Sequence, residues 1–450
     1  MYNLVIGYNM DAKKEADVEM RVVKGTRDYM PAEQSVREMI RSTLVDTFKL
    51  YNFGPLETPI LEYYDILASK YAGGAEILKE TYTLTDQANR KLGLRYDLTV
   101  PFSRVIAMNQ NTRMPFKRWE IGKAFRDGPI KLGRYREFTQ CDVDVVGIAS
   151  MAADAELISM ATMVFKKLEI NVYLEVNNMK VLSGVLTQAG VKKEDIKSAI
   201  LTVDKLKKIG AQGAEEELIS KGIKDIDFDM LFKVLSESES NEQTIERIRG
   251  TITNKTCLEG LNEIEELFKY IKEFSINSEV KFTPSLARGL GFYTSTIFEV
   301  YAKGSKMTSS VAGGGRYDDI IKKFLNSEKN YPAVGISFGL EAIYDTLMGL
   351  GKVTNLDRNM LKAYVIAIDN IDYAIPIVAK LRKAGITADV NYSNKKLKKE
   401  LEYANDMKIP FVVIVGGREA KENVGTLRDM NSKEQISMPI DKIIEKILRR

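Results

Sequence analysis

The sequence contains no histidine among its 450 residues and only two cysteines, Cys141 and Cys257. Without histidine, no imidazole side chain can act as general base, activate a nucleophile or bind a metal ion. Two cysteines far apart in sequence argue against a disulfide framework and a structural zinc site, and they fit a reducing compartment. Any chemistry must therefore depend on carboxylates, arginines, lysines, a tyrosine or the substrate itself.

Long apolar runs and a strong charge bias are also missing. No stretch approaches the length of a membrane span, and the N-terminus lacks the basic-then-apolar pattern of a signal peptide, so we expect a cytoplasmic protein without membrane contact. Lysine and arginine number 66 against 62 aspartate and glutamate residues, so any nucleic-acid surface must be a local patch. The length predicts two or three domains.

The most informative stretch is 117–146, which predicts two strands joined by a loop. In the second strand we expect an apolar set, Phe138, Cys141, Val143 and Val145, to alternate with a polar set, Thr139, Gln140, Asp142 and Asp144. The loop region is rich in turn residues and in cations, which are Lys123, Arg126, Lys131, Arg134 and Arg136. Arginine is suited to bidentate capture of phosphate, although a solvated hairpin tip would carry similar charges.

A shorter hairpin is predicted upstream, within 81–102. Its second strand, which runs to Thr99, would present Asp97 and Thr99 on the same face as Arg95, because side chains alternate along a strand. The alternative is that Asp97 and Thr99 merely end the strand before Pro101.

Helical spacing predicts helices over 32–50 and 151–168. From 176 to 275 the chain changes to Lys/Glu-rich helical segments without strong strands, which we interpret as a helical module with solvated charged faces. A nucleic-acid contact is the second interpretation of those charges. Strand character returns in 285–302, in the glycine-rich 309–321 and in 333–347, which leads into a helix.

The C-terminal part shows regular alternation of strands and helices after a natural linker at 349–360. Buried apolar strands such as 363–368 and 411–417 are separated by helical segments. This pattern predicts a small, mainly parallel sheet of about a hundred residues.

Several motifs occur in the order found in one known family: KGTRDYMP, LRYDLTVPF, FRDGP followed by GRYREFTQCDVD, ARGLGFYT and AGGGRYDD. With them, the chain from about residue 21 to 450 resembles the class II aminoacyl-tRNA synthetases, and within these the histidyl-tRNA synthetases. The resemblance implies an α+β fold with an antiparallel sheet core, a helical insertion and a C-terminal α/β anticodon-binding domain. The expected parts are an N-terminal extension at 1–20, the catalytic core at 21–175 and 276–350, the helical insertion at 176–275 and the anticodon-binding domain at 351–450.

The resemblance also implies an activity. A homodimeric histidine–tRNA ligase would join L-histidine to ATP, release pyrophosphate and pass the histidyl group to the 3′ end of histidine tRNA. ATP would be used with Mg²⁺, and we assign no residue as a metal ligand. The alternative is a paralogue of reduced activity that acts as a histidine-sensing regulatory subunit or an RNA-binding subunit.

Histidine binding is assigned by the resemblance to positions that match the family's motifs. Asp97 and Tyr293 would hold the imidazole ring, and Phe292 precedes Tyr293 in the same signature. The α-ammonium group needs acceptors, which would be Thr99, Gln140 and Asp144.

ATP binding and catalysis are assigned in the same way. Phe138 would stack on adenine, and Arg134 would help to hold the phosphates. Arg126 and Arg288 would act as catalytic residues that grip the α-phosphate and the histidine carboxylate from opposite sides. Two fixed cations can stabilise the charge developing at phosphorus without a proton-transferring residue.

Three places depart from the family's pattern. The third motif usually ends Gly-Leu-Glu-Arg, with the arginine on the γ-phosphate of ATP, but Ala342 stands there, and we expect Arg134 or a loop lysine to substitute. Gly291 and Phe292 replace an acid and a hydroxyl in the usual RGLDYY signature. Gly128 replaces an acid in the arginine-rich loop.

Overall fold

The computed structural model describes residues 20–69, 75–236, 240–288, 291–353, 361–392 and 396–449. The described residues fall into two compact units, of which the larger holds Arg37–Lys352 and the smaller holds Val353–Arg450. In these described ranges, none of the helices has the length and apolar character needed to span a bilayer. The expected extension at 1–20 lies almost wholly outside the described residues.

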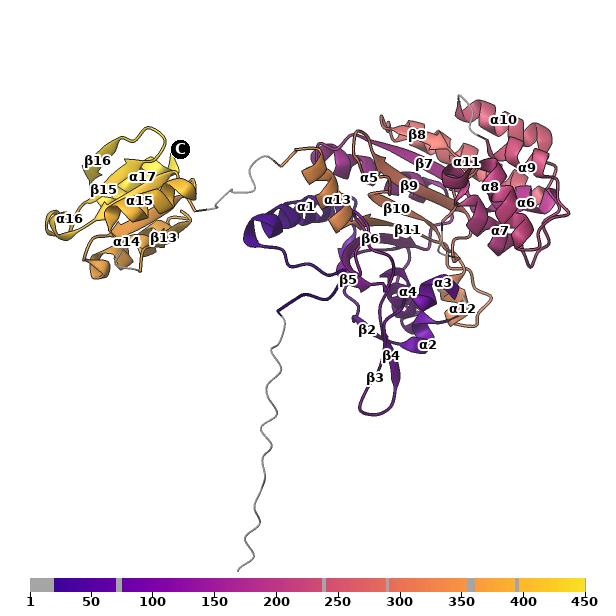
Figure 1. The fold of residues 1–450 in the computed structure, drawn as a ribbon, viewed down its shortest axis with the longest axis horizontal. Helices are drawn as coiled ribbons and strands as arrows, with labels where there is room; N and C mark the ends of the chain where they lie inside the picture. The colour runs from indigo at the N-terminus through magenta and orange to yellow at the C-terminus, as the bar shows by residue number, and fades with distance from the viewer. Residues whose placement is uncertain are drawn as a thin grey trace, which may run out of the picture. The chain divides into compact units, whose positions relative to one another are not determined.

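An eight-stranded sheet forms the centre of the larger unit (Figure 1). Neighbouring strands run antiparallel except for the outermost pairs, β1 with β5 and β7 with β8, which are parallel. The strands predicted within 117–146 are confirmed as β5 and β6, and the expected antiparallel core is confirmed with them. The order across the sheet is β1 (Gly54–Pro55), β5 (Phe116–Phe125), β6 (Glu137–Val146), β11 (Ala333–Gly339), β10 (Ala312–Arg316), β9 (Thr296–Ala302), β7 (Val172–Asn178) and β8 (Glu279–Phe282).

Helices cover one face of this sheet. The predicted helices are confirmed as α1 (Pro31–Leu50) and α5 (Ala152–Lys167). Phe48 of α1 and Phe165 of α5 both pack on Phe338 of β11, with ring centroids 5.7 and 5.9 Å apart. A third helix, α13 (Leu340–Gly349), is tied to β6 because the Glu341 carboxylate accepts the backbone N–H of Thr139 at 2.8 Å.

The opposite face of the sheet carries polar residues and glycines in register. One row crosses five adjacent strands and consists of Glu120, Asp142, Ser337, Gly313 and Glu299. Side chains alternate between the two faces of a strand, so the same strands supply this polar row on one face and the apolar residues under the helices on the other. The fold thus presents a polar floor on the side that the helices leave open.

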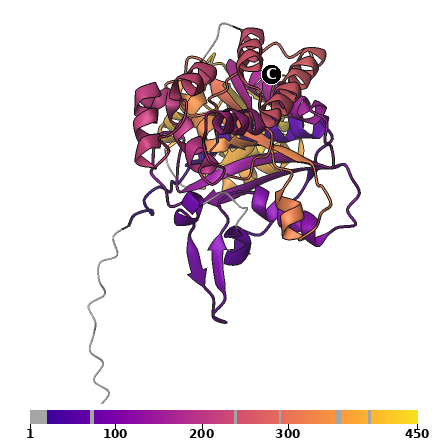
Figure 2. The ribbon, with the colours of Figure 1, turned by 90° about the vertical axis from the view of Figure 1, so that its right-hand side faces the viewer.

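A small sheet in the order β2 (Leu61–Tyr63), β4 (Lys91–Leu94) and β3 (Thr83–Thr85) contains the predicted upstream hairpin. The hairpin of β3 and β4 projects from the larger unit in both views (Figures 1 and 2). The prediction of a strand as far as Thr99 was wrong, because Thr99 begins the helix α4 (Thr99–Met108). The Asp97 carboxylate accepts the N–H of Val100 at 3.0 Å. Pro101 lies in the first turn of α4, where a backbone N–H would have no partner within the helix, so a proline costs no hydrogen bond there.

Short helices complete this part of the chain. They are α2 (Tyr64–Leu67), α3 (Ala75–Lys79) and α12 (Ile320–Phe324). Between β7 and β8 the described chain is helical, and these helices gather beyond one end of the large sheet in Figure 1. They are α6 (Met179–Gln188), α7 (Ile196–Val203), α8 (Leu206–Ser220), α9 (Phe228–Leu235), α10 (Asn241–Thr251) and α11 (Lys255–Glu273).

The smaller unit is a five-stranded sheet in the order β13 (Ala388–Val390), β12 (Ala363–Ala367), β14 (Phe411–Val415), β15 (Gly425–Asp429) and β16 (Gln435–Met438). The prediction of a mainly parallel sheet is confirmed for β13, β12 and β14, which pair parallel, and was wrong for the rest, since β14–β15 and β15–β16 pair antiparallel. The helix between β14 and β15, α16 (Gly417–Glu422), is too short for the crossover that parallel strands need.

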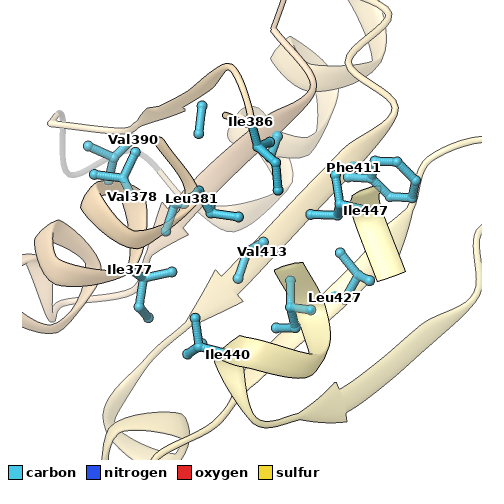
Figure 3. Close-up of a cluster of buried hydrophobic side chains, with 14 of the residues drawn as sticks. Ile377, Val378, Leu381, Ile386, Val390, Phe411, Val413, Leu427, Ile440 and Ile447 are labelled. Carbon is cyan, nitrogen blue, oxygen red and sulfur yellow. The ribbon is translucent and has the colours of Figure 1, made fainter. Parts of the chain in front are cut away.

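Figure 3 shows the apolar core beneath α14 (Ile371–Lys383) and α17 (Ile440–Leu448), where Val413 and Leu427 meet Ile377 and Ile440. The remaining helix is α15 (Leu397–Asp406).

Candidate active site

A cavity of about 1090 Å³ opens on the polar face of the large sheet. Every residue that the sequence analysis selected for substrate binding or catalysis lines it, although these residues come from three separate stretches of the chain, within 97–99, 126–144 and 288–293. They are Asp97, Thr99, Arg126, Arg134, Phe138, Gln140, Asp144, Arg288, Phe292 and Tyr293. Their convergence on one concavity makes it the candidate active site.

The strand β6 supplies much of the cavity floor. Phe138, Gln140, Asp142 and Asp144 occupy alternate positions of this strand and all line the cavity. The expectation that Phe138 belongs with the apolar set was therefore wrong, because residues two apart on a strand share a face. The apolar face of β6 holds Cys141, Val143 and Val145, as predicted, and Thr139 as well.

Glycines in the neighbouring strands make room for charged side chains on this floor. A Cβ atom on Gly335 of β11 would collide with the Asp144 carboxylate, and one on Gly313 of β10 would collide with the Arg288 guanidinium. The glycine-rich sequence of β10 thus serves the placement of Arg288.

Two half-buried arginines are held against aromatic rings. Arg126 donates from Nε to the Tyr96 carbonyl at 3.0 Å, and its guanidinium lies 5.1 Å from the ring centre of Phe138. Arg288 donates from Nη1 to the Phe298 carbonyl at 3.2 Å and lies 5.3 Å from the ring centre of Tyr293. Both cations are fixed before any ligand binds, which is what electrostatic stabilisation of a transition state requires.

Three buried carboxyls line the cavity together with these arginines. Burial raises the pKa of Asp97 to about 6, although the N–H of Val100 and the charge of Arg126 oppose the shift. Burial also raises the pKa of Asp142 to about 8, and the negative charge of Asp144 adds to the shift while Arg118 opposes it. The pKa of Asp144 is raised by burial too. A bound cation would favour the ionised form of each carboxyl.

Arg118 of β5 lies directly opposite Asp144 in the β5–β6 pair and is completely buried. Its Nη2 lies 2.7 Å from Asp144 Oδ2 and donates to the Leu98 carbonyl at 3.1 Å. Asp144 also accepts the Tyr317 hydroxyl at 2.6 Å. These contacts join β5, β6 and the start of α4, so they set the position of the acidic residues on β6.

Phe292, which the sequence analysis placed with the histidine-binding residues, is almost completely buried. It packs on Tyr293 with ring centres 4.7 Å apart and meets the Tyr317 ring edge-on at 6.1 Å. Its apolar ring thus supports two tyrosines that line the cavity.

Some cavity residues were missed by the sequence analysis. Asp142 could have been found, because it shares the alternation of Gln140 and Asp144. Glu80 and Asp204 could not, since each comes from a segment without a motif. Glu80 lies where a side chain on Gly128 would be, and Arg134 Nη2 is 3.4 Å from its carboxylate. An acid from elsewhere in the chain therefore stands beside the loop position that lacks one.

The arginine-rich loop is attached to α13 next to Ala342. Asp345 accepts the backbone N–H of Gly133 at 3.1 Å and the hydroxyl of Tyr135 at 3.0 Å. Ala342 itself lines the cavity, as do Lys131 and Arg134 of the loop. The two loop cations and the alanine thus share one cavity wall.

Comparison with protein families agrees with this geometry. The family model described as "Histidyl-tRNA synthetase" matches residues 25–343, and the model described as "Anticodon binding domain" matches residues 362–450. A relative named "Histidine–tRNA ligase 1" from Bacillus cereus is 42% identical over 427 residues, which cover 95% of this chain and 99% of that protein.

Solved structures share the architecture. A histidyl-tRNA synthetase from Nostoc sp. has a TM-score of 0.81 at 26% identity, covering 96% of this chain and all of that one. An "ATP phosphoribosyltransferase regulatory subunit/histidyl-tRNA synthetase" from Bacillus halodurans has a TM-score of 0.74 at 20% identity, covering 89% of this chain and 100% of that one. The second likeness concerns the fold alone.

Asp142→Asn is expected to change how stability depends on pH. The Asp142 carboxyl has a pKa of about 8 in the folded protein and about 3.9 in an unfolded chain. The folded state therefore keeps a proton that the unfolded state has lost, so the free energy of unfolding falls as pH rises from about 4 to about 8. The variant has no carboxyl to titrate here, so its free energy of unfolding does not fall in this way. Urea unfolding should therefore show the free energy of unfolding of the variant rising relative to that of wild type between about pH 5 and about pH 9.

Asp86→Asn, on the β3–β4 turn, is the matched control. Hydrogen bonds from Arg90 lower the pKa of Asp86, so this carboxyl finishes titrating below that pH window. Its stability difference from wild type should stay constant through the window. A constant difference for Asp142→Asn as well would contradict the raised pKa.

Proposed function

Because this chain belongs to the histidyl-tRNA synthetase family, we propose that its cavity activates L-histidine with ATP and then transfers the histidyl group to the 3′ end of histidine tRNA. The observation that carries the proposal is the convergence of two fixed arginines, an aromatic ring and buried acceptors in one cavity. Such a site offers phosphate, adenine and amino-acid contacts together.

The activation step is a displacement at the α-phosphorus of ATP. A histidine carboxylate oxygen forms the new bond to phosphorus, the bond to the bridging oxygen of the β-phosphate breaks, and pyrophosphate leaves. The attacking carboxylate is already ionised, so no general base is required. Arg126 and Arg288 would stabilise the charge on the phosphoryl oxygens, which accounts for activity in a chain without histidine.

The amino-acid end of the cavity supports recognition of histidine. We assign the imidazole to Asp97 and Tyr293, and the α-ammonium group to Thr99 and Gln140 with a carboxylate of β6. Asp144 is the carboxylate that the resemblance implies, and it already contacts Arg118 and Tyr317. An imidazole N–H can donate to a buried aspartate, whereas an apolar side chain of similar size would leave that acceptor unpaired.

The nucleotide end of the cavity supports ATP binding. Phe138 would stack on adenine, while Arg134 and Lys131 would meet the phosphates. In the part of the chain that the structure describes, no group of three or more cysteine, aspartate and glutamate side chains is placed to hold a metal ion. We therefore propose that Mg²⁺ binds mainly through the ATP phosphates, as it does in many nucleotide sites.

The oligomeric state and the cellular compartment are also part of this proposal. We infer a homodimer, and the exposed side chains of Ile60, Leu61 and Tyr63 next to Pro59 support an interface there. The C-terminal unit would bind the tRNA anticodon, and the cytoplasm is where ATP, histidine and tRNA occur together. A paralogue of reduced activity, acting as a regulatory or RNA-binding subunit, is the alternative, and the absence of an arginine at position 342 favours the loss of activity.

Amino-acid-dependent ATP–pyrophosphate exchange tests the proposed function. With Mg²⁺ and no tRNA, we expect exchange with histidine and with none of the other standard amino acids, because only histidine offers an imidazole to Asp97 and Tyr293. Exchange with a different amino acid would contradict the specificity. Histidine binding without any exchange would favour the regulatory paralogue.

Arg134→Ala tests the substitute for the missing third-motif arginine. Loss of a charged phosphate contact should raise the KM for ATP by about tenfold or more while the KM for histidine changes little. The control is Arg136→Ala, because Arg136 of the same loop pairs with Asp127 at 3.0 Å and is not among the cavity-lining residues. An unchanged KM for ATP in Arg134→Ala would remove Arg134 as the substitute.

Gly313→Ala tests the position of Arg288. The added methyl group would collide with the guanidinium, so kcat for the exchange reaction should fall by about tenfold or more. Gly250→Ala in α10 is the control, since nothing lies within 4 Å of a Cβ there, and it should keep full activity with equal or higher stability. Full activity in Gly313→Ala would show that catalysis does not need Arg288 at this place.

A further inference from the structure

Glu299 of β9 lines the cavity beside Arg288, although the ligands proposed for this place carry phosphate and carboxylate groups. Neither the motifs nor the proposed function assigns a role to it. A carboxylate repels other anions, and the repulsion is stronger in a half-buried site than in bulk water. Glu299 would therefore oppose binding of ATP and of the histidine carboxylate unless its charge serves Arg288.

The Nη1 atom of Arg288 is held from three sides. It lies over Gly313, since a Cβ atom on that glycine would collide with it. It donates to the Phe298 carbonyl at 3.2 Å and lies 3.5 Å from Oε1 of Glu299. Glu299 is the residue opposite Gly313 in the β9–β10 pair. Both polar contacts use Nη1, so Nε and Nη2 are the donors that the described chain leaves for a ligand.

Tyr301 fixes the carboxylate of Glu299 in turn. Its hydroxyl donates to Glu299 Oε2 at 2.5 Å, so the phenol holds one oxygen and the other faces the guanidinium. The two residues are two apart on β9 and share a face. The Tyr301 ring stacks on that of Tyr173 in β7, with ring centres 5.3 Å apart and planes at 19°. Arg288 is therefore aligned by a carboxylate that is itself held in place.

A helix of the insertion compensates the acid next to Glu299. Glu175 of β7 lies directly opposite Glu299 in the β7–β9 pair, and like charges at such positions destabilise a sheet. Lys207 of α8 donates to Glu175 at 2.5 Å, which supplies a cation for this second acid. Glu299 and Glu175 thus each have a cation beside them, and for Glu299 it is Arg288.

We propose that Glu299 is a positioning residue that orients Arg288 for the activation step, with Tyr301 as its support. A free arginine side chain can adopt many conformations, and fixing one of them before the reaction lowers the cost of reaching the transition state. Glu299 does not need to touch ATP or histidine for this role, because it acts through Nη1. The inference rests on the proposed function and adds to it the groups that hold a catalytic cation.

ATP–pyrophosphate exchange by the full-length protein, with histidine and Mg²⁺, tests this role. Glu299→Gln keeps the size of the side chain and removes its charge, so kcat should fall by about tenfold. The KM for ATP should stay the same or fall, since a negative charge beside the phosphates is gone. Tyr301→Phe should cause a smaller loss of kcat in the same direction, because Glu299 keeps its charge there.

The matched control is Glu279→Gln. Glu279 is also an acid of this sheet, on β8, where it pairs with Lys281 and Lys303 at 3.1 and 2.7 Å and is not among the cavity-lining residues. The kcat and KM of this variant should equal those of wild type.

A second test places Glu299→Gln in an Arg288→Ala background, with single-turnover adenylate formation measured at high enzyme concentration. A residue that acts through Arg288 should cause no further loss there. An unchanged kcat in Glu299→Gln, a raised KM for ATP, or an equal loss with and without Arg288 would each overturn the inference. In these cases wild type still exchanges with histidine, so the proposed function stands. Wild-type protein without any exchange would remove the proposed function and this inference with it.

Discussion

The buried contact between Arg118 and Asp144 determines where the rest of the candidate active site lies. A completely buried guanidinium is tolerable only with close partners, and here Asp144, Glu120 and the Leu98 carbonyl surround it. Removing one partner of such a pair leaves an uncompensated charge, at a cost of about 3–5 kcal/mol. Since the contacts join β5, β6 and the start of α4, they fix the acids that line the cavity relative to one another. The stability of the core and the geometry of the site therefore depend on the same ions.

The large sheet that contains this contact combines two functions through strand alternation. On β6, Cys141, Val143 and Val145 are buried on one face, while Gln140, Asp142 and Asp144 form the cavity floor on the other. Glycines in β10 and β11 let charged side chains lie against the sheet where any Cβ would exclude them. A change of register by one residue would exchange the two faces, so packing of the helices on the apolar face also holds the polar face in place.

Sequence reasoning found the parts of the site whose signal is local. Alternation along 117–146 predicted β5 and β6, and the motif resemblance selected residues that line the cavity. It failed at Thr99, where Pro101 was interpreted as the end of a strand although a proline also suits the first turn of a helix. Sequence reasoning also could not predict that Glu80 lies next to Gly128, because that contact depends on tertiary packing between segments without a shared pattern. In the C-terminal unit the prediction of a mainly parallel sheet was wrong at β15 and β16 for a similar reason, since the sequence pattern did not show that only the short helix α16 joins β14 to β15.

Stability and specificity oppose each other on the cavity floor. Asp97 and Asp142 are buried with raised pKa values and with one oxygen each that has no partner in the described structure. Such groups destabilise the free protein, and a ligand that supplies donors to both recovers the lost interactions. An amino acid with an apolar side chain would satisfy only the ammonium acceptors and leave Asp97 unpaired at the side-chain end. Discrimination would then arise from the cost of that unpaired buried acceptor, which is how a polar pocket can reject a substrate of similar size.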